Sequence, residues 1–184
     1  MRSEKELTRI SKFLSLVLRH QPQSIGITLD ENGWTEVSTL LEKSAQAGVA
    51  LDLPTLQYLV QTNSKQRFAF NAAADKIRAS QGHSVPVELG YEAQQPPEVL
   101  YHGTTTSAVE DILLTGLQKQ NRHHVHLSSD VDTALKVGQR HGKPYVFEVM
   151  AGEMFRNNFL FYQSANGVWL TEEVPPQYLR SPFA

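Results

Sequence analysis

The sequence predicts an α+β protein of two lobes, one formed by residues 1–90 and the other by residues 91–184. In the first lobe, three segments with the apolar spacing of helices precede two short β-like runs. In the second lobe, short strand-like and helix-like segments alternate. Between the lobes, residues 85–97 are mostly polar and end in Gln94-Gln95-Pro96-Pro97, a composition typical of a boundary.

The first predicted helix spans residues 4–20, where Leu7, Ile10, Leu14 and Val17 recur at three- and four-residue spacing. It ends before Pro22, because a proline disfavours helical backbone in the residue that precedes it. Residues 27–29 then favour a short strand, and residues 30–33 have the composition of a turn.

Two more helices and a hairpin complete this lobe. Ser38 is expected to cap a helix that ends near Gly48, and Asp52 followed by Pro54 is expected to begin the next helix. Residues 67–70 and 76–79 have the pattern of two strands joined by a short loop. Three helices followed by a hairpin is the element order of a winged-helix module, so we predict that fold for the first lobe.

The second lobe is predicted from shorter segments. Strands are expected at residues 99–102, 124–127 and 145–149, and helices at residues 106–115 and from Ser129 or Asp130 to Val137. Residues 159–162 and 168–170 are expected to pair as a hairpin around the turn at residues 164–167. This lobe is therefore expected to mix helices with short strands.

The composition excludes several classes of protein. With 184 residues, of which 40% are hydrophobic and 20% charged, the chain is long enough to bury a hydrophobic core. The absence of cysteine excludes disulfide scaffolds, cysteine–zinc sites, iron–sulfur clusters and a thiolate nucleophile. No apolar run approaches the ~18 residues of a membrane span, and the first residues lack the apolar core of a signal peptide. We therefore expect a cytoplasmic protein that does not associate with membranes.

The distribution of charge restricts how this protein can bind nucleic acid. Its net charge is −2, and basic and acidic residues are nearly balanced in both halves of the chain. Such a surface does not attract phosphate backbones in general, so any phosphate binding has to come from a few well-placed groups.

Basic residues in the first lobe are candidates for such groups. Arg19 and His20 either complement the dipole at the end of the first helix or form an anion site with a guanidinium fork and a proton-carrying imidazole. Lys65 and Arg67 either mark a solvated strand edge or, on one side of an extended chain, reach a common phosphate. Residues 81–84 place hydrogen-bond donors around a glycine, which permits close approach of a ligand.

The most informative residues of the second lobe are His102, Gly103 and Thr104. They offer an imidazole, an unobstructed backbone and a hydroxyl at one place, although a His-Gly pair is also compatible with a plain turn. Alternation along the next strand directs His124 and His126 to one face and His123 to the other. No cysteine or ordered carboxylate completes a ligand set with these histidines, so a metal site is not expected.

Six motifs of this chain occur in an order that resembles the RNA 2′-phosphotransferases, the bacterial members in particular. The resemblance extends from about residue 5 to residue 175, and six motifs in register make it far more specific than any one of them. The motifs are Leu18-Arg19-His20, Lys65-Gln66-Arg67-Phe68, Ile77-Arg78-Ala79 through Gly82-His83-Ser84, Tyr101-His102-Gly103-Thr104, His124-Val125-His126-Leu127-Ser128 and Arg140-His141-Gly142.

The resemblance implies a winged-helix lobe that binds RNA and phosphate, followed by an ADP-ribosyltransferase-like lobe that binds NAD⁺. It implies an enzyme that removes an internal 2′-phosphate from RNA, as left at a tRNA splice junction, and that consumes NAD⁺ as a co-substrate without a metal. RNA carrying that phosphate is the expected partner, and no obligate protein partner is evident.

The resemblance also assigns roles to individual residues. The expected catalytic residues are Arg19, His20, Arg67 and Arg140. The residues expected to bind NAD⁺ are His102, Gly103, Thr104, His126 and Ser128. The residues expected to contact the substrate phosphate or the RNA are Lys65, Gln81, His83 and Ser84.

One departure from the wider transferase pattern bears on the acceptor. Many ADP-ribosyltransferases place a glutamate on a late strand, where this chain has Gly167-Val168, while His126 stands near the place of their tyrosine. A carboxylate would repel a phosphate dianion, so its absence favours a phosphate acceptor. Glu172 or Glu173 contributes only if this register is wrong by several residues.

Two alternative functions account for only part of these residues. An ADP-ribosyltransferase that acts on a protein, a nucleic-acid end or a small molecule does not explain Arg19, His20 and Arg67. A winged-helix DNA-binding regulator does not explain the His102-Gly103-Thr104 motif.

Overall fold

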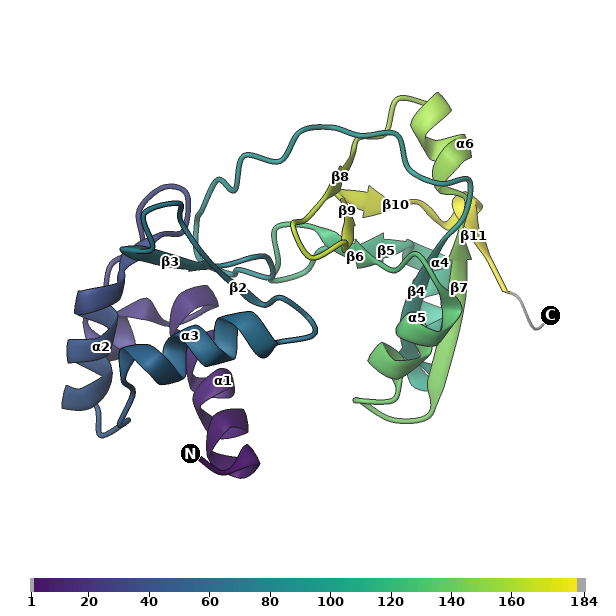
Figure 1. Ribbon diagram of the computed structural model, residues 1–184. Helices are drawn as coiled ribbons and strands as arrows, with labels where there is room; N and C mark the ends of the chain where they lie inside the picture. The colour runs from purple at the N-terminus through teal and green to yellow at the C-terminus, as the bar shows by residue number, and fades with distance from the viewer. Residues whose placement is uncertain (1, 182–184) are drawn as a thin grey trace. The chain divides into compact units, whose positions relative to one another are not determined.

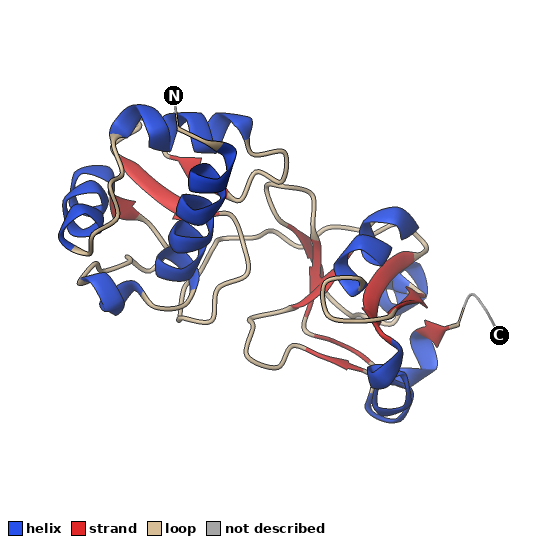
Figure 2. Ribbon diagram, turned by 90° about the horizontal axis from the view of Figure 1, so that it is seen from below, coloured by secondary structure: helices blue, strands red, loops and turns tan. Residues whose placement is uncertain are grey.

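The computed structural model describes residues 2–181, and the chain divides into two compact units, one ending at Gly90 and the other beginning at Tyr91 (Figure 1). Both units mix helices with short antiparallel strands, which confirms the predicted α+β class (Figure 2). Within residues 2–181, no helix combines the length and the apolar character needed to cross a membrane.

The first unit contains the three helices and the hairpin that the sequence predicts. β3 pairs with both other strands in an antiparallel sheet of order β1-β3-β2. Asp52 caps α3, because its side chain accepts a hydrogen bond from the backbone N–H of Thr55. The elements are α1 (Glu4–Arg19), the 3₁₀ turn η1 (Pro22–Ile25), β1 (Thr35–Glu36), α2 (Val37–Gln46), α3 (Leu53–Thr62), β2 (Phe68–Phe70) and β3 (Lys76–Ala79).

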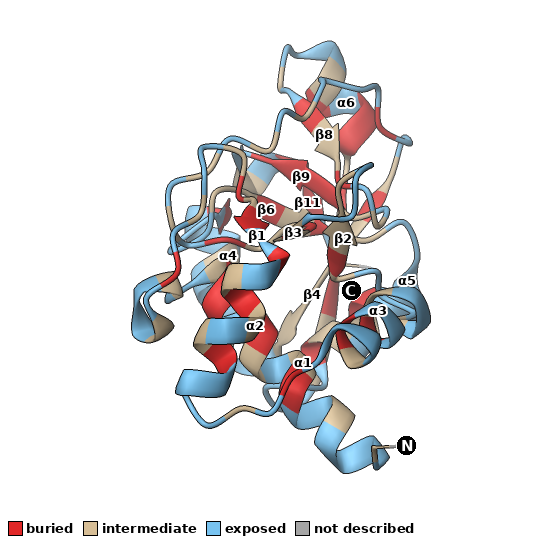
Figure 3. Ribbon diagram, turned by 60° about the vertical axis from the view of Figure 1, so that its left-hand side comes forward, coloured by how far each residue is buried: buried red, intermediate tan, exposed pale blue. Residues whose placement is uncertain are grey.

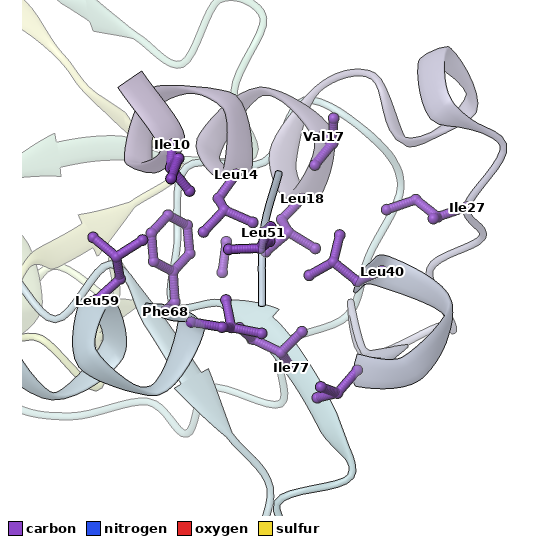
Figure 4. Close-up of a cluster of buried hydrophobic side chains, with 13 residues drawn as sticks. Ile10, Leu14, Val17, Leu18, Ile27, Leu40, Leu51, Leu59, Phe68 and Ile77 are labelled. Carbon is purple, nitrogen blue, oxygen red and sulfur yellow. The ribbon is translucent and has the colours of Figure 1, made fainter. Parts of the chain in front are cut away.

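The core of this unit holds α1 against the sheet (Figure 4). Buried side chains recur along one side of α1 and α2, while the other side faces solvent (Figure 3). Burying one such aliphatic or aromatic side chain contributes about 1.5–3 kcal/mol, so this cluster holds α1 against the sheet. Its largest fully buried members are Ile10, Leu14, Leu18, Leu40, Leu56 and Ile77.

Two local predictions for this unit are wrong. Residues 27–29 form no strand, because no other strand pairs with them; Ile27 instead buries its side chain in the core as the chain leaves η1. Ser38 does not cap α2; the helix begins at Val37, with Glu36 as its N-cap. The strand β1 runs directly into this helix, and the N–H of Val37 donates to the backbone carbonyl of Asp75 instead.

The second unit contains the predicted strands, helices and late hairpin, together with shorter elements that the sequence did not indicate. Its antiparallel sheets have the orders β11-β7-β4, β6-β9-β8 and β10-β5. The elements are β4 (Leu100–Thr105), η2 (Thr106–Ala108), α4 (Val109–Thr115), β5 (Leu117–Gln118), β6 (Val125–Leu127), α5 (Val131–Gly138), β7 (Pro144–Val149), α6 (Ala151–Arg156), β8 (Phe161–Gln163), β9 (Trp169–Thr171), β10 (Glu173–Val174), η3 (Pro176–Tyr178) and β11 (Leu179–Arg180).

Two contacts fix β4, the strand that carries His102, Gly103 and Thr104, within this unit. Tyr101 and Ser128 exchange two backbone hydrogen bonds of 2.9 and 2.8 Å, which join β4 to the end of β6. On β4, a Cβ atom at Gly103 would lie 1.7 Å from the carbonyl oxygen of Ala134 in α5. Glycine is therefore required here for helix-on-strand packing, whereas the sequence had suggested an unobstructed backbone.

Candidate functional site

The first group of predicted site residues lies at the C-terminal end of α1. Arg19 is the last helical residue and His20 is the C-cap. The backbone carbonyl of Arg19 accepts hydrogen bonds from the N–H groups of Ser84 at 2.9 Å and Val85 at 3.4 Å. Because the last carbonyls of a helix have no partner within the helix, this segment satisfies an acceptor that would otherwise depend on solvent. The chain after β3 thus returns to the end of α1.

His20 and Ser84 are also joined through their side chains. The Oγ atom of Ser84 lies 2.9 Å from Nδ1 of His20. Since both residues are exposed, this bond limits the rotation of an imidazole that would otherwise sample several rotamers. It leaves Nε2 as the ring nitrogen that is not bonded to Ser84.

The loop that carries Lys65 and Arg67 differs from its predicted form. We expected an extended chain with both side chains on one side, but β2 begins only at Phe68 and Gln66 has a φ of 41°. The cause is a turn at Asn63, whose side-chain oxygen accepts from the backbone N–H of Lys65 at 3.0 Å and from Nη1 of Arg67 at 3.3 Å. Asn63 therefore orients the Arg67 guanidinium, a role that we did not predict; the Asn-Ser-Lys turn composition is the signal that indicates it.

Residues 81–84 fold between these two cationic elements. Gly82 has a φ of +85°, and a Cβ atom there would lie 3.6 Å from Nη1 of Arg19. His83 is only 2% exposed, and its Nε2 atom lies 3.3 Å from the position that a Cβ atom at Gly33 would take. Gln81 is half-buried and Ser84 is exposed. The structure thus places the His83 side chain in the interior of the unit, while contacts of these residues with RNA stay predictions.

In the second unit, His102 and His126 lie side by side. The Nδ1 atom of His102 is 3.1 Å from the backbone carbonyl oxygen of His126. A carbonyl only accepts, so Nδ1 carries the proton, and Nε2 of the neutral ring is left as an acceptor. Burial lowers the pKa of His102 below its usual 6.5, and the positive charge of Arg122 lowers it further. His102 is therefore a neutral imidazole at neutral pH.

This lowered pKa predicts how the stability of the protein depends on pH. The unfolded chain binds a proton at His102 below about pH 6.5, whereas the folded protein resists it. The stability that this difference contributes is fully present above pH 6.5 and is lost as pH falls toward the folded pKa. We expect His102→Gln to reduce the decline in unfolding free energy between about pH 7 and pH 5, which for one histidine is at most ~1.4 kcal/mol per pH unit.

Urea unfolding at a series of pH values measures this slope. The matched control is His141→Gln, since His141 is exposed and follows α5. An unchanged slope in His102→Gln, or an equal change in both variants, would contradict the assignment of a neutral His102.

Further aromatic and cationic groups surround the histidines of the second unit. His124 packs edge-on against Tyr162, with ring centroids 5.5 Å apart, and against Tyr91 at 6.3 Å. Nη1 of Arg122 lies 3.4 Å from Nδ1 of His126. We predicted no role for Arg122 from the sequence, although Arg122, His124 and His126 follow one another at two-residue spacing.

The remaining predicted residues have mixed placements. Thr104 lies on β4 opposite Tyr145 of β7, and Arg140 is exposed beyond the end of α5. The arginine beside His126 is thus Arg122, while a catalytic role for Arg140 stays a prediction.

Glu172 forms an ion pair with Lys119. Glu173 is exposed on β10, where it pairs with Gln118. Over the described part of the chain, no three histidine, aspartate or glutamate side chains are arranged to hold a metal ion.

The chain matches the family described as RNA 2′-phosphotransferase, Tpt1 / KptA family, over residues 5–173. The chain belongs to this family. A relative from Flavobacterium johnsoniae named "Probable RNA 2′-phosphotransferase" is 55% identical over 92% of this chain and 93% of its own length. Relatives of the same name from Hahella chejuensis and Burkholderia pseudomallei are 52% and 51% identical, over at least 95% of each chain.

Membership of the RNA 2′-phosphotransferase family confirms the resemblance that the six motifs indicated. The family match begins before Arg19 and ends after Ser128 and Arg140, so both groups of candidate residues lie within it. It supports an enzyme that removes a 2′-phosphate from RNA.

Proposed function

We propose that this protein removes an internal 2′-phosphate from RNA, such as that left at a tRNA splice junction, in a reaction that consumes NAD⁺. The observation that carries this proposal is the pair of cationic elements in the first unit, at the end of α1 and in the loop before β2, which one short segment joins. Near-neutral net charge makes such a local phosphate site the main source of affinity for RNA.

The element order of the first unit supports its assignment as a winged-helix lobe. Three helices pack on an antiparallel sheet whose last two strands, β2 and β3, form a hairpin. Arg19, His20 and Arg67 lie in this unit, so we assign the 2′-phosphate of the RNA to it.

The chemistry of the His102 ring supports the second unit as the NAD⁺-binding, ADP-ribosyltransferase-like lobe. Its protonated Nδ1 donates a hydrogen bond to the His126 carbonyl oxygen, so its Nε2 is an acceptor. The hydroxyl groups of a ribose are donors of the matching kind. The hydroxyls of Thr104 and Ser128, both half-buried, supply further polar contacts. These residues fit a nucleotide sugar, and bound NAD⁺ would supply an activated anomeric carbon with nicotinamide as leaving group.

The first step requires little catalysis from the residues of the protein. The RNA 2′-phosphate, largely a dianion at neutral pH because its second pKa is about 6, attacks the anomeric carbon, and nicotinamide leaves as a neutral molecule. The nucleophile is already ionised, so no general base is needed. The role of the cationic residues in this step is to bind and orient the phosphate.

The second step places greater demands on the same residues. A ribose hydroxyl attacks the new phosphodiester, the RNA 2′-oxygen departs as a hydroxyl, and ADP-ribose 1″,2″-cyclic phosphate is released. Negative charge grows on the phosphate oxygens, where the guanidinium groups of Arg19 and Arg67 stabilise it. His20 donates a proton to the departing RNA oxygen. By resemblance, Arg140 stabilises the same charge; Arg122, whose Nη1 lies 3.4 Å from Nδ1 of His126, is an alternative.

The test is nicotinamide release from NAD⁺ with an oligonucleotide that carries an internal 2′-phosphate. We expect one nicotinamide for each RNA dephosphorylated, no release with the matched 2′-hydroxyl oligonucleotide, and full activity in EDTA. Inorganic phosphate as the product, or loss of activity in EDTA, would indicate a metal phosphatase instead. Release of nicotinamide only with a protein or small-molecule acceptor would indicate a different ADP-ribosyltransferase.

A further inference from the structure

One segment of the first unit, Ser80–Ser84, contacts both cationic elements that the proposed function assigns to the RNA phosphate. Ser84 is predicted by resemblance to contact RNA, but its hydrogen bonds lead to the end of α1. We propose that Ser80–Ser84 is a positioning segment: Ser84 sets the orientation of the His20 imidazole, and Ser80 sets the loop that carries Arg67. This inference rests on the proposed function, because it concerns the residues that bind the phosphate there.

At the Ser84 end, two contacts involve neighbouring residues, Arg19 at the end of α1 and its C-cap His20. The backbone N–H of Ser84 donates to the carbonyl of Arg19 at 2.9 Å, and its Oγ lies 2.9 Å from Nδ1 of His20. Ser84 is thus attached through its backbone to the end of α1, next to the His20 imidazole that its hydroxyl contacts. Because Ser84 engages Nδ1, we assign the proton transfer to Nε2.

At the Ser80 end, a second pair of contacts joins the segment to the loop that carries Arg67. The Oγ of Ser80 donates to the carbonyl of Gln66 at 2.7 Å, and its backbone N–H donates to the carbonyl of Arg67 at 2.9 Å. Ser80 is buried, so these bonds are shielded from water. These bonds stabilise the backbone of Gln66, whose φ of 41° is a left-handed conformation. Residues other than glycine adopt that conformation only at a cost in free energy.

The middle of the segment lies between these two pairs of contacts. The His83 side chain is buried against the turn at Gly33, which anchors the segment in the interior of the unit. Gly82, with a φ of +85°, takes a left-handed conformation that favours glycine and turns the chain past the Arg19 guanidinium. The segment is therefore held at both cationic elements and at its middle.

A double-mutant cycle separates positioning from direct RNA contact. We expect Ser84→Ala to slow the second step about three- to tenfold, the range for loss of one hydrogen bond, and to raise the ratio of ADP-ribosylated RNA to product. In a His20→Ala background the same substitution should have no further effect on that ratio. Ser84→Thr, which retains the hydroxyl, should restore most of the rate.

The control for a general loss of stability is Ser15→Ala, which removes one hydroxyl hydrogen bond, to the carbonyl of Ser11, from the same helix. It should leave the ratio of intermediate to product unchanged. Additive effects of Ser84→Ala and His20→Ala would overturn the proposal and favour a direct contact between Ser84 and RNA.

Ser80→Ala tests the other end. It should reduce the preference for 2′-phosphorylated over 2′-hydroxyl RNA in binding about three- to tenfold, and it should not do so in an Arg67→Ala background. Its melting temperature shows whether the fold survives, and an unchanged preference in a folded protein would contradict the role of Ser80.

A measurement without turnover keeps this inference distinct from the proposed function. The ¹⁵N chemical shifts of the His20 ring in the substrate-free protein should change in Ser84→Ala and not in Ser15→Ala. Unchanged shifts overturn the positioning role even if the enzyme is active. Changed shifts in a protein that releases no nicotinamide support the contact and overturn the proposed function alone.

Discussion

Arg67→Ala is expected to stop the reaction after its first step, so that ADP-ribosylated RNA accumulates as a slower-migrating species on a gel. Expulsion of nicotinamide already has a good leaving group, so losing one cation should slow it only modestly. Expulsion of an alkoxide from an anionic diester depends on the cations around the phosphate, and one missing donor typically costs about 10²–10³ in rate. Arg19→Ala and His20→Ala should give the same intermediate, His20 through loss of its proton-donating role.

His102→Ala provides the contrasting result for this experiment. If His102 binds NAD⁺, its loss should block the first step, and no intermediate should accumulate. A uniform slowing of both steps in all of these variants, with no intermediate visible, would refute the division of roles between the two units.

The same assay assigns the arginine of the second unit. Arg140→Ala is expected from the resemblance to accumulate intermediate, whereas the structure places Arg122 within 3.4 Å of His126. The two variants form a matched pair, because both arginines are exposed and lie outside the secondary-structure elements. The variant that accumulates ADP-ribosylated RNA identifies the arginine that acts on the phosphate.

Gly103→Ala is expected to have the largest effect on folding. Its Cβ atom would lie 1.7 Å from the carbonyl oxygen and 2.6 Å from the carbonyl carbon of Ala134. Both are backbone atoms of α5, so relief requires the whole helix to move off β4. Overpacking of a core typically costs 1–3 kcal/mol, and a clash with backbone places this variant at about 3 kcal/mol or more. Chemical denaturation measures the loss.

The control for Gly103→Ala is Gly152→Ala in the same unit. A Cβ atom there would lie 2.3 Å from Oε2 of Glu98, but that carboxylate is the end of an exposed side chain that can rotate away. The cost is then the loss of the exposed ion pair between Glu98 and Arg156, about 0–1 kcal/mol. A loss of stability in Gly103→Ala no larger than the ~0–1 kcal/mol expected for Gly152→Ala would contradict the close packing of α5 on Gly103.

The family, the main helices and the candidate residues of this protein follow from its sequence. The apolar spacing in residues 4–20 predicts α1 because a 3.6-residue period is a local property that any sufficiently long amphipathic helix displays. The same is true of Asp52 as a cap and of the strand runs at residues 76–79 and 145–149. Arg19, His20 and Arg67 are predicted as site residues because they belong to the six motifs that occur in the order of the family. That order is visible in the sequence alone.

Only the tertiary structure decided what those residues contact. Strands of two residues, such as β10 and β11, have no period to detect and exist because a partner strand pairs with them. The turn at Asn63, the packing of α5 on Gly103 and the bond between Ser84 and His20 each join a residue to a partner whose identity the local sequence does not encode. Composition and period fix which face of an element is buried, whereas hydrogen-bond partners far apart in the chain are fixed only when the core has brought them together.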